Sequence, residues 1–176
     1  MYYGALEAGG TKMVCAIGDA DKNIIDRISI PTGTPDQSLP AMIDYFKKYD
    51  ISALGIGTFG PADINPNSPT YGSIMRSPKK DWEGFSLYKA FTDALGCLVV
   101  VDTDVNAAAW GEYLYGALKG LNSGMYLTVG TGIGGGIISD GRLIHGMEHP
   151  ETGHILIPRR TGDDIPVSYT HLRAHE

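Results

Sequence analysis

The 176-residue sequence has few cysteines, no long apolar run and no cluster of like charges. Its two cysteines, Cys15 and Cys97, lie in apolar stretches, so we expect reduced thiols in the core and not a disulfide framework. No segment approaches 18 uninterrupted apolar residues, and the amino terminus lacks a basic stretch followed by an apolar one. These absences predict a cytoplasmic protein that does not span a membrane.

Charges of both signs are scattered along the chain. Fourteen Lys and Arg oppose 20 Asp and Glu for a net charge of −6, and no run exceeds a pair such as Lys79–Lys80. Such a chain lacks a basic surface for non-specific attachment to nucleic acid or an anionic membrane. At 43% hydrophobic residues, the composition is that of a globular domain with a sizeable core. The length suits one full domain and not two.

Glycine, in contrast, is abundant and clustered. The chain has 24 glycines, with clusters at residues 9–10, 55–60 and 130–136. Clustered glycine indicates tight turns or backbone that approaches a ligand closely.

Apolar periodicity predicts the order of the elements. Strands are expected over residues 3–6, 13–17, 24–30, 51–56, 98–101, 125–129 and 137–138. Helices are expected over residues 39–46, 87–95 and 106–118, the second capped by Ser86 and ended by Gly96. The uninterrupted apolar run at 98–101 predicts a strand buried on both faces. Residues 62–84 lack a period and predict an excursion over the surface.

This order predicts an α/β domain followed by the start of a second domain that opens in a similar way. We expect the first domain over residues 1–120 and an incomplete second domain over 121–166. Residues 167–176 show no period and are interpreted as a non-native tail. In an incomplete domain the second hairpin would expose its apolar side chains together. These are Ile133, Ile137, Ile138, Leu143 and Ile144.

Both outer glycine clusters lead from strand to strand. The segment 7–12 therefore lacks the helix that follows a P-loop, and 130–136 lacks the helix of a dinucleotide-binding unit. Such turns can still direct backbone N–H groups at an anion. Two in one chain favour a nucleotide held between two domains, with two ordinary hairpin turns as the alternative.

Carboxylates mark two further candidate sites. Asp104 lies where an apolar strand ends and a helix begins, a position that suits a base accepting a proton from a hydroxyl. The alternatives are that Asp104 or Asn106 caps the helix and that Asp102 is structural. Residues 151–154 add a carboxylate and an imidazole, and taken alone they are typical of a surface loop.

Five segments in this order resemble the ROK family of sugar kinases, repressors and open reading frames. They are EAGGTK at 7–12, GTFGP at 57–61, DVNAAAWGE at 104–112, GTGIGGG at 130–136 and ETGH at 151–154. Within the family, residues 7–12 and 149–151 look most similar to bacterial fructokinases. The resemblance covers residues 4–166.

The resemblance implies an actin-like ATPase (ribonuclease H-like) fold and ATP-dependent phosphorylation of a hexose, most directly fructose to fructose 6-phosphate. Another sugar (glucose, mannose or an N-acetylated hexosamine) and an inactive fragment are the alternatives. The cofactors implied are ATP and Mg²⁺, with Asp104 as the general base. The implied ATP-binding residues are Gly9, Gly10, Thr11, Lys12, Thr131, Gly132 and Gly134. The implied sugar-binding residues are Gly60, Pro61, Thr103, Asp104, Glu151 and His154.

The resemblance also implies a homodimer and a structural Zn²⁺ in the full-length protein. His154 matches the first zinc ligand, and the cysteine-rich stretch that would supply the others is missing here. Glu7 stands where most relatives have Asp, and Thr103 stands where many glucose kinases have Asn; both differences fit fructokinase-like members. A repressor of the family needs a helix-turn-helix before the first hairpin. Because three residues precede Gly4, we expect a kinase with no nucleic-acid partner.

Overall fold

The computed structural model describes residues 1–77, 79–130, 133–145, 152 and 161–162. The chain divides into two compact units, residues 1–104 and 105–176. The domain limits expected from the sequence, 1–120 and 121–166, remain predictions, and residues 167–176 lie outside the described part. Among the described residues, no helix combines the length and apolar character needed to cross a membrane.

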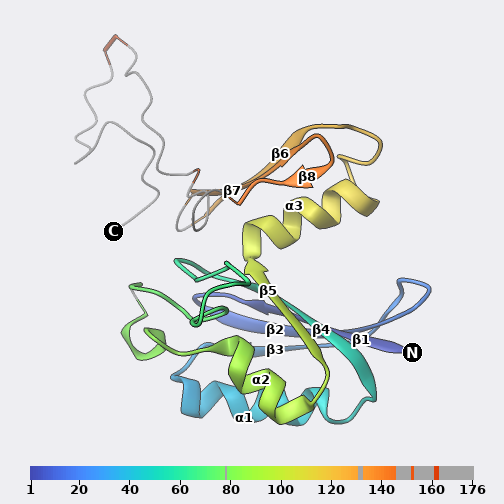
Figure 1. Cartoon of the computed structure of the whole chain (residues 1–176), viewed down its shortest axis with the longest axis vertical. Helices are drawn as coiled ribbons and strands as arrows, with labels where there is room; N and C mark the ends of the chain where they lie inside the picture. Colours follow the sequence, from blue (N-terminus) through green and yellow to red (C-terminus); the bar gives the residue numbers. More distant parts are fainter. Residues whose placement is uncertain (78, 131–132, 146–151, 153–160, 163–176) are drawn as a thin grey trace. The chain divides into compact units, whose positions relative to one another are not determined.

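Unit 1 is built on a five-stranded sheet with the strand order β3-β2-β1-β4-β5 (Figure 1). The strands are β1 (Tyr2–Ala8), β2 (Lys12–Asp19), β3 (Ile24–Pro31), β4 (Ile51–Thr58) and β5 (Leu98–Thr103). β1, β2 and β3 form an antiparallel meander, whereas β4 and β5 run parallel to β1. The mixed sheet confirms the predicted opening hairpin and the α/β class.

Two helices supply the crossovers between the parallel strands. They are α1 (Pro35–Phe46) and α2 (Leu87–Leu95), and both lie on the same face of the sheet (Figure 1). The Ser86 hydroxyl accepts a hydrogen bond from the Lys89 amide, and Gly96 ends α2 in the left-handed conformation with φ 64°. Ser86 and Gly96 are thus the start and stop signals that the sequence predicts.

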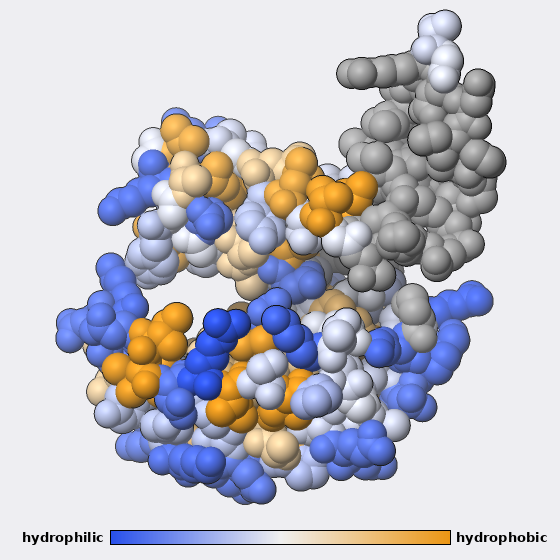
Figure 2. Space-filling view, turned by 180° about the vertical axis from the view of Figure 1, so that it is seen from behind, coloured by the Kyte–Doolittle hydropathy of each residue, from blue (hydrophilic) through white to orange (hydrophobic). Residues whose placement is uncertain are grey.

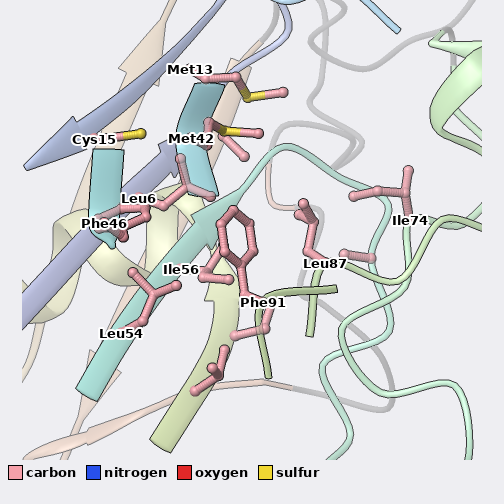
Figure 3. Close-up of a cluster of buried hydrophobic side chains, with 14 of the residues drawn as sticks. Leu6, Met13, Cys15, Met42, Phe46, Leu54, Ile56, Ile74, Leu87 and Phe91 are labelled. Carbon is pink, nitrogen blue, oxygen red and sulfur yellow. The ribbon is translucent and has the colours of Figure 1, made fainter. Parts of the chain in front are cut away.

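The core of unit 1 fills the space between the sheet and these two helices (Figure 3). Phe46 of α1 and Phe91 of α2 meet edge to face, with ring centroids 6.0 Å apart. Leu54 and Ile56 of β4 are buried in the same cluster. Cys15 is also part of it and is free, as expected, and burial raises the pKa of its thiol to about 12.

The strand β5 differs from its prediction. Leu98 and Val100 are 66% and 52% exposed, whereas Val99 and Val101 are buried. The prediction of burial on both faces is wrong because β5 is an edge strand and both crossover helices lie on one face of the sheet. Apolar side chains therefore reach the surface of the described residues (Figure 2).

The described residues of unit 2 form one helix and a three-stranded antiparallel sheet of order β6-β7-β8. The helix is α3 (Asp104–Tyr115), which begins on the last residue of unit 1, and the strands are β6 (Gly124–Val129), β7 (Ile133–Ser139) and β8 (Arg142–Leu143). The predicted second hairpin is confirmed. The predicted helix begins two residues earlier than expected and ends at Tyr115.

Helix α3 lies close against one face of β7. A Cβ on Gly136 would overlap the carbonyl oxygen of Val105, and a Cβ on Gly134 would lie 2.9 Å from Cγ1 of Val105. Ile138 follows on the same face by the two-residue period of a strand and is 1% exposed. The expectation that Ile138 is exposed with its neighbours is therefore wrong. The exposed large apolar side chains of β6 are Met125, Leu127 and Val129.

Candidate functional site

Three parallel strands of unit 1 end in one row. Ala8 pairs with Thr58 across β1 and β4, and Thr58 pairs with Thr103 across β4 and β5. The residues that follow these ends, among them Gly9 and Asp104, therefore leave the sheet at the same edge. In α/β proteins, the carboxyl ends of parallel strands are where ligands bind. This edge is the candidate site.

The first component of the site is the turn from Gly9 to Lys12. The Gly9 amide donates to the Lys12 carbonyl at 3.0 Å. Thr32, which follows β3, donates its hydroxyl to the Gly9 carbonyl at 2.7 Å and its amide to the Thr11 carbonyl at 3.0 Å. These bonds occupy the carbonyl oxygens of Gly9, Thr11 and Lys12 and fix the conformation of the turn.

The same turn leaves donors unused. Within the described part of the chain, no acceptor bonds the amides of Gly10 and Thr11 or the Thr11 hydroxyl. Consecutive backbone N–H groups of this kind form anion-binding concavities. Lys12 follows them in the sequence and is exposed. The turn thus has the donors and charge to hold a phosphate group.

The second component is the loop after β4, which starts at Gly60 and Pro61 and is organised by Asp63. One carboxylate oxygen of Asp63 accepts from the hydroxyls of Ser68 and Thr70 at 2.5 and 2.6 Å. Burial opposes ionisation of Asp63, but the bonds from its partners outweigh this and lower its pKa. This stabilisation is present above the unfolded-state pKa and is lost as pH falls through the folded-state pKa.

The third component is the end of β5, where the Tyr71 side chain bonds the strand backbone. The Tyr71 hydroxyl donates to the Val101 carbonyl at 2.9 Å and accepts from the Val101 amide at 2.8 Å. Burial raises the pKa of Tyr71, which keeps the phenol in its donating form. The loop after β4 therefore holds β5 three residues before Asp104.

Asp104 itself is compatible with both interpretations of the sequence. It is half-buried and is the first residue of α3, where a carboxylate interacts favourably with the helix dipole. It also lies at the candidate edge of the sheet beside Thr103, which is 2% exposed. The neighbouring Asp102 accepts a bond from the Thr103 amide at 2.7 Å, a local structural role.

The structure brings part of the predicted site together. Gly9, Gly10, Thr11, Lys12, Gly60, Pro61, Thr103 and Asp104 follow or end the strands at this edge of unit 1. Gly134 lies within β7 of unit 2. Thr131, Gly132, Glu151 and His154 lie outside the described residues.

The described residues contain no group of three His, Cys, Asp or Glu side chains able to hold a metal ion. The predicted zinc ligand, His154, is not among them.

The two glycines of the first turn should tolerate substitution differently. A Cβ on Gly9 would lie 2.7 Å from the Lys12 carbonyl oxygen, which is backbone, whereas a Cβ on Gly10 meets only Lys79 Cε at 3.9 Å. We expect Gly9→Ala to destabilise the chain by about 1–3 kcal/mol and Gly10→Ala to change its stability little. Urea unfolding followed by circular dichroism measures both, and equal losses would contradict the contact pattern.

Comparison with known proteins relates this site to a family. The profile of the ROK family matches residues 3–165. The chain is 46% identical over 159 residues to the fructokinase of Lactococcus lactis subsp. cremoris, covering 90% of this chain and 54% of that protein. It is 43% identical over 165 residues to the fructokinase of Pediococcus pentosaceus, covering 94% and 57%. The chain spans about half the length of these curated relatives.

A solved structure agrees with this relationship. The ROK family glucokinase from Streptomyces griseus, in complex with glucose and AMPPNP, superposes with a TM-score of 0.73 at 30% identity, covering 90% of this chain and 51% of that one. The fold is accordingly that of the actin-like ATPase sugar kinases, as expected. Since the family profile covers nearly the whole chain and the sequence motifs occur in the expected order, the chain belongs to the ROK family.

Proposed function

We propose that this chain is part of a sugar kinase that transfers the γ-phosphoryl group of ATP to fructose and forms fructose 6-phosphate. The observation that carries the proposal is the row of strand ends, Ala8, Thr58 and Thr103, which brings the glycine turn and Asp104 to one edge of the sheet. A phosphate-binding turn and a carboxylate base are the two parts that phosphoryl transfer to a hydroxyl needs.

In this reaction each group has one task. The sugar hydroxyl oxygen forms a bond to the γ-phosphorus, the bond from that phosphorus to the β,γ-bridging oxygen breaks, and ADP leaves with the bond's electron pair. Asp104 accepts the hydroxyl proton. The free amides of Gly10 and Thr11 bind phosphate oxygens. Glu151 and His154 are proposed to contact the sugar, and Thr131, Gly132 and Gly134 the phosphates, on the strength of the family resemblance.

The nucleotide enters as its Mg²⁺ complex, so the metal is part of the substrate. When bound, Mg²⁺ neutralises phosphate charge that the protein would otherwise have to balance. The structural Zn²⁺ stays a prediction, because its expected ligand His154 lies outside the described residues. The homodimer and the cytoplasmic location stay predictions.

Fructose is the preferred sugar in this proposal. Two curated relatives with more than 40% identity are fructokinases, and Thr103 stands beside the proposed base. We expect a higher kcat/KM for fructose than for glucose, mannose or N-acetylated hexosamines. A coupled assay of ADP release with each sugar decides, and a clear preference for glucose would overturn the fructose assignment.

The assay should also use a protein that is as long as the relatives. We suggest assaying this chain together with a chimera in which residues 1–165 are followed by the corresponding second half of the Lactococcus lactis relative. The chimera tests whether the candidate site of this chain supports transfer. A folded chimera without activity toward any of these sugars would refute the proposed function.

A further inference from the structure

A lysine outside every sequence motif lies beside the glycine turn. Lys79 precedes a short 3-10 helix, Lys80–Trp82, and its Cε is 3.9 Å from the position that a Cβ on Gly10 would occupy. The residue is half-buried. The end of the lysine stem therefore lies next to Gly10, one of the two turn residues whose amides bond no acceptor among the described residues.

The adjacent residues Thr32 and Gly33 link the glycine turn to the segment that carries Lys79. Thr32 bonds the carbonyl groups of the glycine turn, and the adjacent Gly33 carbonyl accepts a hydrogen bond from Nε1 of Trp82 at 2.8 Å. Trp82 is 1% exposed, and the Lys79 amide donates to the buried Ser77 hydroxyl at 3.1 Å. Lys79 is thus held beside the turn by a rigid support.

The charge of Lys79 is not balanced within the described residues. Lys80 pairs with Glu83 at 3.3 Å and Lys89 pairs with Asp93 at 2.7 Å, but no carboxylate among the described residues lies within ion-pair distance of Lys79. Its neighbour Gly10 and the following Thr11 have amides that bond no acceptor among the described residues. This set of donors is complementary to an anion.

We propose that Lys79 binds a phosphoryl group held by the turn from Gly9 to Lys12. Its ammonium supplies the charge, while the amides of Gly10 and Thr11 supply directed hydrogen bonds. The proposal deepens the proposed function, on which it rests for the identity of the ligand. Anion binding itself does not require catalysis and can be measured separately.

The test is a titration of the ¹⁵N-labelled chain at constant ionic strength, with the Gly10 and Thr11 amide signals as readout. Inorganic phosphate, ATP and fructose 6-phosphate are the three probes. Lys79→Met removes the charge and keeps an apolar stem over Gly10, with Lys79→Gln as a second uncharged variant. Lys80→Met is the matched control, because Lys80 is adjacent, exposed and paired with Glu83.

We expect saturable shifts of the Gly10 and Thr11 signals with at least one probe. Loss of the Lys79 charge should raise the Kd about tenfold, whereas Lys80→Met should change it less than about twofold. A response to ATP alone assigns the site to a nucleotide phosphate, and a response to fructose 6-phosphate alone assigns it to a sugar phosphate; both support the proposal.

Three results would overturn it. They are the absence of saturable shifts with all probes, an unchanged Kd in both Lys79 variants, and equal weakening by the Lys79 and Lys80 variants, which would indicate diffuse attraction. Failure of the proposed function looks different. In that case the chimera phosphorylates no sugar, while the Lys79-dependent shifts persist.

Discussion

Replacing Asp104 by Asn is expected to lower the rate of ATP-dependent fructose phosphorylation by about 10²- to 10⁴-fold, the usual cost of losing a general base. Asn has nearly the same size as Asp and also serves well at the start of a helix. Folding and sugar binding should therefore change little. The measurement is kcat from coupled ADP release in the chimera, together with the Kd for fructose from calorimetry.

The neighbouring Asp102→Asn variant is the matched control for this prediction. Its side-chain oxygen can still accept the hydrogen bond from the Thr103 amide, so most of the activity should remain. If Asp104→Asn keeps near-normal turnover, Asp104 serves only to begin α3.

The elements that depend on neighbouring residues could be predicted from the sequence. The hairpin of β1 and β2 follows from two apolar stretches around a glycine turn, and α2 follows from apolar spacing between Ser86 and Gly96. These signals act over a few residues, so the local sequence contains them.

The environment of an element could not be predicted in the same way. The apolar run in β5 is equally compatible with a central strand and with an edge strand, and strand order depends on distant pairing. Likewise, Gly134 and Gly136 satisfy a phosphate-turn pattern, although the structure gives them another reason. They allow Val105 of α3 to approach β7, a contact that no local pattern indicates.

The candidate site was predicted where its residues form motifs and missed where single residues support them. The glycine turn and Asp104 lie in recognisable segments. Thr32, Tyr71 and Lys79 do not, and they reach the site from 21, 30 and 69 positions away in the sequence, counted to Thr11, Val101 and Gly10. Tyr71 and Lys79 belong to the stretch without periodicity, which the sequence indicates only as a surface excursion.

Trp82→Ala is expected to destabilise the chain by about 3–5 kcal/mol, the range for removing a large buried aromatic side chain. Trp82 is 1% exposed and packs edge to face against Phe59 and Phe85, with ring centroids 6.4 and 5.3 Å away. The variant also leaves the Gly33 carbonyl without its indole donor. Urea unfolding followed by far-ultraviolet circular dichroism gives the free energy of unfolding.

The two tryptophans of the chain provide an internal comparison for this effect. Trp110 is 37% exposed, so Trp110→Ala should cost much less than Trp82→Ala, and equal losses would contradict the burial difference. Trp82→Phe keeps an aromatic ring and should cost about 1–3 kcal/mol, mainly for the lost bond to Gly33. That bond joins Gly33, which follows the turn-bonding Thr32, to the segment that carries Lys79. Trp82→Phe should therefore also weaken phosphate binding at Gly10 and Thr11 while the chain stays folded.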